Sequence, residues 1–236
     1  MNNLEIIIPI YNEKENIKTL INLFDKDINS EIIITLCYDN ENDDIFEIQE
    51  YLKQSRFEIQ LKKNQGTGPC SAVKTGLKNS KSDCMIVYPA DDFLNTKLID
   101  KIYYKFKKGA DVVVCSRFIK GGSMKGCPLL KSLLVRTASF TLYWLSSIPV
   151  QDASNGFRMF SRKLIDKFEI ESSLGFAYSL ELLVKAHRYG FKIDEIPAQW
   201  EERSVGSSNF KVLKWIKQYI RWYLYGLKTS WLFKKK

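Results

Sequence analysis

The stretch CMIVYPADDFLN, residues 84–95, joins an apolar run to two adjacent carboxylates, Asp91 and Asp92. A short, unbroken apolar run bounded by turn residues is typical of a strand that is buried on both faces. The acidic pair has two explanations at this point. It could cap a following helix, because Asp at a helix start accepts hydrogen bonds from free backbone N–H groups. It could also hold a divalent cation against a phosphate.

Similar apolar runs recur in the first half of the chain, each near a helical pattern or a polar turn. They occupy residues 4–10, 31–38, 57–61 and 111–116. Strands that alternate with helices predict an α/β fold with a mainly parallel sheet, flanked by helices on both faces. In such sheets, ligands bind beyond the carboxyl ends of the strands.

Polar turns follow three of these predicted strands. They are Tyr11-Asn12-Glu13, Asp39-Asn40 and Ala90-Asp91-Asp92. At one edge of a parallel sheet, their acidic and amide groups would converge on a shared ligand. This convergence favours a nucleotide pocket, and it favours a metal over a helix cap for Asp91 and Asp92.

The composition indicates a folded protein with an anionic partner. Of the 236 residues, 45% are hydrophobic, and the formal charge is +9. This apolar content supports a substantial core and excludes a disordered chain. The positive charge favours phosphorylated substrates, an acidic lipid surface or nucleic acid. Because no nucleic-acid recognition module is present, we expect no nucleic-acid partner.

Cysteine usage and hydrophobic segments predict a cytoplasmic location. The five cysteines form no CxxC pair, which is typical of reduced thiols. The one histidine, His187, lies in a helical pattern and is interpreted as a packing or surface residue. Because the first predicted strand begins almost at the first residue, we expect no secretory signal. The longest apolar candidate, residues 137–151, is shorter than a membrane span of roughly 20 residues, so we expect no transmembrane helix.

Seven segments in series resemble the family 2 glycosyltransferases, in the branch similar to dolichol-phosphate-mannose synthase. They are IIIPIYNEKENI, NQGTGPCSAVKTG, VYPADD, CSRFIKGGSMKG, QDASNGFRMFSRK, GFAYSLELLVKAHRYGFKIDEIPAQW and ERSVGSSNFK. The resemblance implies a Rossmann-like GT-A domain over residues 1–208. It also implies a UDP- or GDP-sugar donor, a divalent metal (Mg²⁺ or Mn²⁺) and inversion at the sugar carbon.

The resemblance also implies roles for individual residues. The donor would contact Pro9, Tyr11, Asn12, Glu13, Asp39, Ala90, Asp91 and Arg117. Asp91 matches the last acid of the family's Asp-x-Asp motif, so it would hold the metal, with Asp92 as a second ligand. The phosphate groups would be bound by Arg117, Lys131 and Arg203.

Catalysis would then depend on Asp91, Asp92 and Arg203. The stretch DASNGFR would support the neighbouring loop through Asp152, Asn155 and Arg158.

Two departures from the family pattern affect this assignment. Pro89 replaces the first metal acid, so Asp92, donor phosphates or water would have to complete the ligand set. The turn YDNEN retains only Asp39 of the family's D-D-G-S turn, which leaves the choice of nucleotide open.

We therefore expect a metal-dependent glycosyltransferase, peripheral at the inner face of a membrane, that transfers a sugar to dolichyl or undecaprenyl phosphate. Two alternatives stay open: a transferase that extends a cell-surface glycan, and a catalytically degenerate binding protein. A phosphate acceptor needs no strong base, because its second pKa is about 6. A sugar hydroxyl does, and Asp92 would be the first candidate. The sugar and the oligomeric state, including a homo-oligomer, are undetermined.

Residues 209–236 form a basic and aromatic tail with eight Lys or Arg and no acid. Helical spacing places four basic residues on one face: Lys214, Lys217, Arg221 and Lys228. A large apolar and aromatic surface accompanies them, contributed by Trp215, Ile216, Tyr219, Trp222, Tyr223 and Trp231. We expect an amphipathic helix lying on an anionic membrane surface. A helix packed on the catalytic domain, or an oligomer contact, is the alternative.

Overall fold

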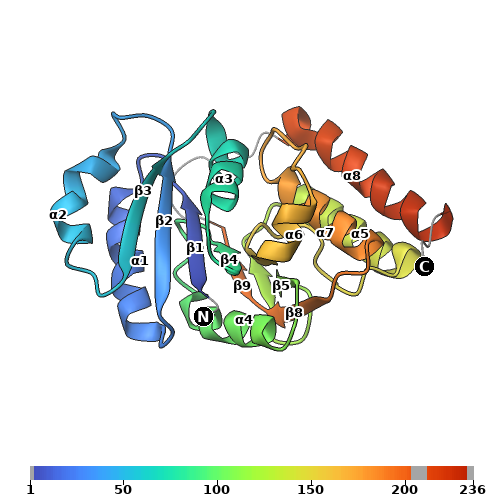
Figure 1. Cartoon of the computed structure of the whole chain (residues 1–236). Helices are drawn as coiled ribbons and strands as arrows, with labels where there is room; N and C mark the ends of the chain where they lie inside the picture. The colour runs from blue at the N-terminus through green and yellow to red at the C-terminus, as the bar shows by residue number, and fades with distance from the viewer. Residues whose placement is uncertain (1–2, 203–211, 233–236) are drawn as a thin grey trace.

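The computed structural model describes residues 3–202 and 212–232. Its centre is a seven-stranded sheet with strand order β3-β2-β1-β4-β7-β5-β8 (Figure 1). The strands are β1 (Leu4–Pro9), β2 (Ile32–Tyr38), β3 (Glu58–Lys63), β4 (Cys84–Val87), β5 (Val112–Ser116), β7 (Arg158–Ser161) and β8 (Ile193–Pro197). A separate two-stranded parallel sheet pairs β6 (Ser123–Lys125) with β9 (Gln199–Glu201).

The prediction of a mainly parallel sheet is confirmed, with one addition. Within the described residues, β7 runs antiparallel between β4 and β5, and the other pairings are parallel. The sequence analysis did not predict β7 as a strand. It begins with Arg158 and has four residues, so it lacks the apolar run by which β1 to β5 were recognised. β8, which contains Asp194 and Glu195, was missed for the same reason.

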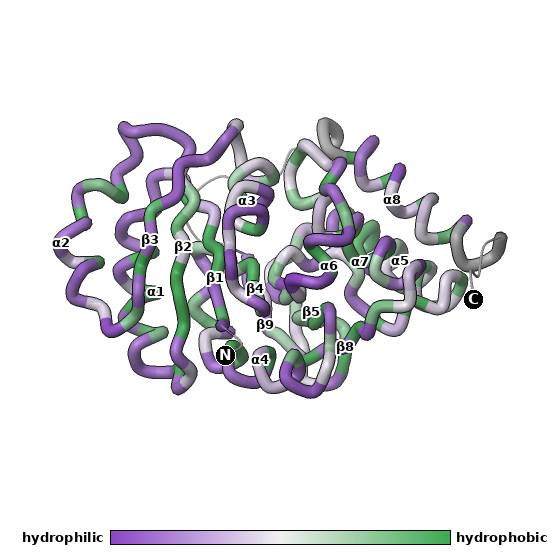
Figure 2. Tube along the Cα trace, viewed as in Figure 1, coloured by the Kyte–Doolittle hydropathy of each residue, from purple (hydrophilic) through white to green (hydrophobic). Residues whose placement is uncertain are grey.

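Helices cover both faces of the sheet because neighbouring strand residues point in opposite directions. Ile6 and Ile8 belong to the core cluster that includes side chains of α1 (Lys14–Asp27) and α4 (Ile99–Lys107). Ile7 belongs to the opposite cluster, with side chains of α3 (Gly68–Asn79), α6 (Arg162–Lys167) and α7 (Ala177–Arg188). Figure 2 shows the resulting hydrophobic strands at the centre of the molecule.

Short helical segments complete the connections between these elements. They are η1 (Asp44–Ile48), α2 (Gln49–Leu52) and η2 (Thr96–Leu98). No helix in the described ranges has the length and apolar content that a bilayer crossing requires.

The tail forms a helix, α8 (Val212–Leu232), that packs against α7 and α5 (Leu129–Ser146) (Figure 1). Trp222 is 2% exposed, and its Nε1 donates to Ser172 Oγ at 2.8 Å. Tyr219 and Tyr223 pack against the same core cluster.

The expectation of a ring on a membrane surface is therefore wrong for Trp222, which packing on the domain buries, whereas Tyr219 and Tyr223 are partly buried. On this face, α8 packs on the rest of the domain, which was the alternative to a membrane surface in the sequence analysis. The predicted boundary at residue 209 falls outside the described residues, as do the side chains of Lys214, Trp215 and Trp231.

Candidate functional site

The carboxyl ends of β2, β1 and β4 lie side by side. β1 pairs in parallel with both neighbours, with Pro9 opposite Cys37 and Ile7 opposite Val87. The chain runs outward from β1 to β2 and β3, then returns to β4 on the other side of β1. Ligands of open α/β sheets bind at such a reversal of strand order. The predicted convergence of the three polar turns is confirmed, whereas their ligand stays a prediction.

The turn after β1 presents three of the residues predicted to contact the nucleotide-sugar donor. Asn12 adopts a left-handed backbone conformation with φ 52°, which Asn tolerates better than most residues. Its N–H donates to Asp43 Oδ2 at 3.1 Å, and its Oδ1 accepts from the N–H of Asp44 at 3.3 Å. Tyr11 is 64% exposed, so its ring is accessible for stacking on a base. Glu13 immediately precedes α1 and accepts a hydrogen bond from Asn16.

Asp39, after β2, fixes the glycine-rich turn at residues 64–68. Its Oδ1 accepts from Asn64 Nδ2 at 2.7 Å, and its Oδ2 accepts from the N–H of Gly68 at 2.8 Å. A carboxylate can accept about four hydrogen bonds, so Asp39 can still accept one from a bound nucleotide-sugar.

Asn64 was missed in the sequence analysis. Its Oδ1 also accepts from Ser71 Oγ at 2.7 Å, which links the turn to α3. The sequence does contain a signal that could have identified Asn64, because this amide residue lies between the apolar run at 57–61 and the glycine-rich turn.

Asp92 makes the contacts of a turn cap. Its Oδ1 accepts from the N–H groups of Leu94 and Asn95 at 3.0 and 3.2 Å. Asn95 Nδ2 donates to both oxygens of Asp92, at 2.9 and 2.7 Å. Burial raises the pKa of Asp92 to about 6, although these hydrogen bonds oppose the rise. Asp92 thus caps the turn at residues 92–95 and not a helix, because η2 begins only at Thr96, and Asp91 becomes the stronger candidate ligand.

Asn95 is a second residue that the sequence analysis missed. It is buried, and its amide bridges Asp92 to the backbone of Gln199 in β9. No motif marks it, because its partner lies in a distant part of the sequence.

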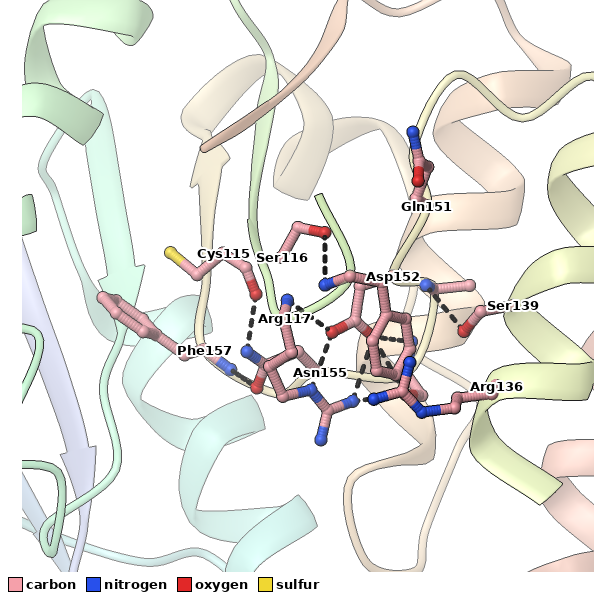
Figure 3. A network of polar contacts seen from close by, with 12 residues as sticks. Cys115, Ser116, Arg117, Arg136, Ser139, Gln151, Asp152, Asn155 and Phe157 are labelled. Carbon is pink, nitrogen blue, oxygen red and sulfur yellow. Dashed lines mark hydrogen bonds and ion pairs between the residues drawn. The ribbon is translucent and has the colours of Figure 1, made fainter. Parts of the chain in front are cut away.

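Arg117, which follows β5, and Asp152 form an ion pair, and Figure 3 shows their side chains directed at each other. Asp152 Oδ2 accepts from Arg117 Nε at 2.7 Å, and Oδ1 accepts from Nη2 at 3.0 Å. Burial alone would raise the pKa of Asp152, but the charge and hydrogen bonds of Arg117 outweigh it and hold this pKa below its usual value.

This pairing gives Arg117 a structural role that the sequence analysis did not predict. Its side chain is only 9% exposed, and its Nη2 also donates to Ser154 Oγ at 2.7 Å. Arg117 therefore braces the loop at residues 152–155, and its contact with a phosphate stays a prediction.

Asn155 and Arg158 hold the same loop, consistent with their expected supporting role. Asn155 Nδ2 donates to the carbonyl of Cys115 at 2.6 Å, and Asn155 Oδ1 accepts from the N–H of Phe157 at 3.2 Å (Figure 3). Arg158 is fully buried, and its Nη2 donates to the carbonyl of Ala153 at 3.4 Å. Burial lowers the pKa of Arg158 to about 10, so the side chain stays charged at neutral pH.

Lys131, near the start of α5, lies beside the end of β9. Its Nζ is 3.4 Å from Glu202 Oε2 and 4.9 Å from the ring centroid of Trp200. Residue 202 is the last one described before the gap, and Arg203 lies outside the described residues.

The carboxylate ligands at this edge of the sheet fit a divalent cation that a substrate phosphate would also bind. In the described part of the chain, no group of three or more His, Cys, Asp or Glu could hold an ion. Mg²⁺ is often bound by one or two carboxylates together with substrate phosphates. Asp91, at the end of β4, fits a site of that kind.

Comparisons with known proteins agree with this geometry. The family model described as glycosyl transferase family 2 matches residues 5–168. The chain is 27% identical over 233 residues to a dolichol-phosphate mannosyltransferase from Pyrococcus furiosus, covering 93% of this chain and 64% of that protein. It therefore spans less than two thirds of the archaeal relative. It is 23% identical over 228 residues to a polyprenol monophosphomannose synthase from Mycolicibacterium smegmatis, covering 89% of this chain and 85% of that protein.

Solved structures share the fold. Glucosyl-3-phosphoglycerate synthase from Mycobacterium tuberculosis, in complex with Mn²⁺, UDP and glucosyl-3-phosphoglycerate, has a TM-score of 0.68 at 16% identity, covering 96% of this chain and 80% of that one. The same enzyme with Mg²⁺ and UDP has a TM-score of 0.67 at 15% identity, covering 96% and 79%. These matches confirm the predicted GT-A type of α/β fold.

Proposed function

Because this chain belongs to glycosyl transferase family 2, we propose that it transfers a sugar from a nucleotide-sugar donor to a polyprenyl phosphate, with inversion at the sugar carbon. The observation that carries the proposal is the reversal of strand order between β1 and β4, which is flanked by Glu13 on one side and Asp91 on the other. The printed names of the two curated relatives support this class of acceptor.

The donor, a UDP- or GDP-sugar, would lie across this edge. Tyr11 and Glu13 would contact the nucleoside, while Asp39 keeps the glycine-rich turn in place. Asp91 would hold Mg²⁺ or Mn²⁺ together with the diphosphate. When bound, such an ion offsets the negative charge that builds on the leaving diphosphate.

The contacts of Asp92 support a phosphate acceptor over a sugar hydroxyl. A hydroxyl acceptor needs a general base, and Asp92 was the first candidate for that role. Both of its oxygens accept hydrogen bonds within the turn. A phosphate monoester is already mostly dianionic near neutral pH and needs no such base. Lys131 and Arg203 would bind the phosphate groups through their positive charges.

A second candidate, a donor-binding protein without transferase activity, is favoured by one observation. Pro89 stands where the first metal acid is expected, and Asp92 is engaged by the turn. A single carboxylate, Asp91, would then have to hold the metal with the donor.

Transfer can be tested with the purified full chain, labelled UDP- and GDP-sugars, a short-chain polyprenyl phosphate, and Mg²⁺ or Mn²⁺. We expect a labelled lipid product that requires the metal. Transfer only to a glycan hydroxyl would replace the proposal with the glycan-extending alternative. Donor binding by calorimetry, with no product on either acceptor, would support the second candidate.

A further inference from the structure

The turns that follow β1 and β2 are joined by hydrogen bonds between side chains and backbone. Three residues provide them, and we call the set the inter-turn contact: Asn12, Asp43 and Asp44. Asp43 Oδ2 accepts from the N–H of Asn12 at 3.1 Å, and Asp44 Oδ1 accepts from the N–H of Lys14 at 3.1 Å. In the other direction, Asn12 Oδ1 accepts from the N–H of Asp44 at 3.3 Å. Each turn thus holds the backbone of the other.

Asp43 is the buried member of the inter-turn contact, with 3% of its surface exposed. Its two carboxylate oxygens have different partners. Oδ1 accepts from the N–H of Ile45 at 3.1 Å and caps η1, while Oδ2 binds Asn12. Its own N–H donates to the carbonyl of Asn40 at 3.2 Å, within the turn after β2. A carboxylate that accepts from two segments fixes their separation, because each hydrogen bond needs a donor–acceptor distance near 3 Å.

Asp44 satisfies the start of α1 from outside the helix. The first N–H groups of a helix have no partner within it, and a nearby side chain often supplies one. Glu13 immediately precedes α1, but its side chain makes no such capping hydrogen bond. The N–H of Lys14, the first residue of α1, is bound by Asp44 instead. The backbone on both sides of Glu13 is therefore held by residues of the turn after β2.

The inter-turn contact also engages the left-handed backbone of Asn12, at φ 52°. Such backbone is uncommon outside glycine and persists where neighbouring contacts favour it. Both the N–H and Oδ1 of Asn12 have partners in the turn after β2. At this point the chain leaves the core, because Ile10 is 4% exposed and Tyr11 is 64% exposed. The contact therefore fixes the place at which the ring of Tyr11 reaches the surface.

We propose that Asp43 and Asp44 are positioning residues for the nucleoside of the donor, acting through Tyr11 and Glu13. The turn after β1 carries these two residues, and the turn after β2 begins with Asp39. The inter-turn contact sets the distance between these two parts of the proposed nucleoside site. A preformed site binds more tightly, because less ordering is needed on binding. This inference rests on the proposed function, whereas the contact between the turns does not.

This role predicts weaker binding with little change in the chemical step. A contact to the nucleoside acts equally on the bound substrate and the transition state, so its loss raises the KM of the donor and leaves kcat nearly unchanged. Replacing Asp91 should instead lower kcat. The loss should also be confined to ligands that contain a nucleoside. Pyrophosphate, which offers only the two phosphates, should bind equally to the natural chain and to variants of the inter-turn contact.

The test compares full-length Asp44→Ala and Asp44→Asn with the natural chain. Asp44→Ala removes the acceptor for the N–H of Lys14, whereas the amide oxygen introduced by Asp44→Asn can still accept it. Asp25→Ala is the matched control, because Asp25 is a partly buried aspartate in the last turn of α1, at the opposite end of the helix. Calorimetry with Mg²⁺ would give the Kd of UDP, GDP and pyrophosphate for each protein.

We expect the Kd of the nucleotide that the natural chain binds to rise about tenfold in Asp44→Ala. The rise should be smaller in Asp44→Asn, and absent in the control. Amide hydrogen exchange gives a readout that needs no ligand. The N–H of Lys14 should exchange faster in Asp44→Ala than in the natural chain, and Asp44→Asn should restore most of its protection.

The outcomes separate the two proposals. Equal nucleotide binding by Asp44→Ala and the natural chain would overturn the positioning role, as would an equal weakening of pyrophosphate binding. If nucleotide binding depends on Asp44 while no sugar reaches any acceptor, the positioning role stands and the proposed transfer falls. A natural chain that binds neither UDP nor GDP would overturn both.

Discussion

Asn95 and Gln199, 104 residues apart in the sequence, are joined by two hydrogen bonds. Asn95 Nδ2 donates to the Gln199 carbonyl at 2.7 Å, and the Gln199 N–H donates to Asn95 Oδ1 at 2.9 Å. The same Nδ2 donates to both carboxylate oxygens of Asp92. The buried amide of Asn95 thus forms hydrogen bonds with both peptide groups of Gln199 and links β9 to the turn that carries Asp91.

Replacing Asn95 should therefore affect both stability and catalysis. Asn95→Ala leaves the peptide groups of Gln199 without partners, and we expect a loss of about 1–3 kcal/mol in the free energy of unfolding. Asn95→Asp should not rescue it, because a second carboxylate would face Asp92. Urea unfolding and steady-state kinetics would measure these effects, with Asn42→Ala, at an exposed position, as the control. Unchanged stability in Asn95→Ala would contradict this role.

Asp91→Asn tests the metal assignment. We expect turnover to fall by about two orders of magnitude or more, the usual loss when a charge-stabilising group is removed. Stability should change by no more than about 0.5 kcal/mol, because the side chain is not in the core. Initial rates across a Mg²⁺ or Mn²⁺ titration would show the loss. Near-normal rates would assign the metal elsewhere. Asp92→Asn should reduce turnover less; equal losses would indicate a shared site.

Arg203 is predicted to bind a phosphate through its two-pronged guanidinium. Arg203→Ala should reduce kcat/KM, and Arg203→Lys should restore only part of it, because an ammonium group cannot form the bidentate contact. Kinetics of the three proteins at one metal concentration would compare them. Full activity of the lysine variant would show that charge alone suffices.

Asp152→Asn should make stability less dependent on acid pH. The folded-state pKa of Asp152 lies below the usual value, so its pairing with Arg117 stabilises the protein above the unfolded-state pKa of about 3.9. This contribution is lost as pH falls through the lower, folded-state pKa. Removing one partner of a buried pair costs about 3–5 kcal/mol at neutral pH.

Urea unfolding at pH 7, 4, 3 and 2 would follow the difference between the natural chain and Asp152→Asn. The difference should be largest at neutral pH and should shrink as Asp152 becomes protonated. Asp166→Asn is the control, because its pair with Arg162 is exposed and should be worth less than about 1 kcal/mol. A constant difference across this range would refute the linkage.

Gly226→Ala tests how closely α8 packs on its neighbours. An added Cβ would lie 3.0 Å from both Leu142 Cδ2 and Val184 Cγ1. Overpacking of this kind costs about 1–3 kcal/mol. In an isolated helix the same change is stabilising by about 1 kcal/mol, because alanine is the better helix former. Thermal unfolding would give the sign, and a higher midpoint would show that α8 is loosely held.

Local patterns in the sequence determined the main elements and the sheet edge at which the candidate site lies. Apolar runs reveal β1, β2 and β4 because strands buried on both faces contain few polar residues. Parallel pairing then brings the turns at Glu13, Asp39 and Asp91 to one edge, whatever the exact register. The same criterion missed β7, because it opens with Arg158, whose charge is compensated by partners that only the fold brings close.

Tertiary structure decided the roles that depend on distant partners. Asp91 and Asp92 are adjacent in sequence, yet Asn95 and the turn engage Asp92. The periodicity of α8 identifies an apolar face, but not what covers it. Packing on α7 and α5 buries Trp222, whereas Leu129 and Trp144 of α5, outside the tail, are exposed apolar side chains. A hydrophobic face gains similar free energy against a protein core or a lipid surface, so only the position of neighbouring helices distinguishes them.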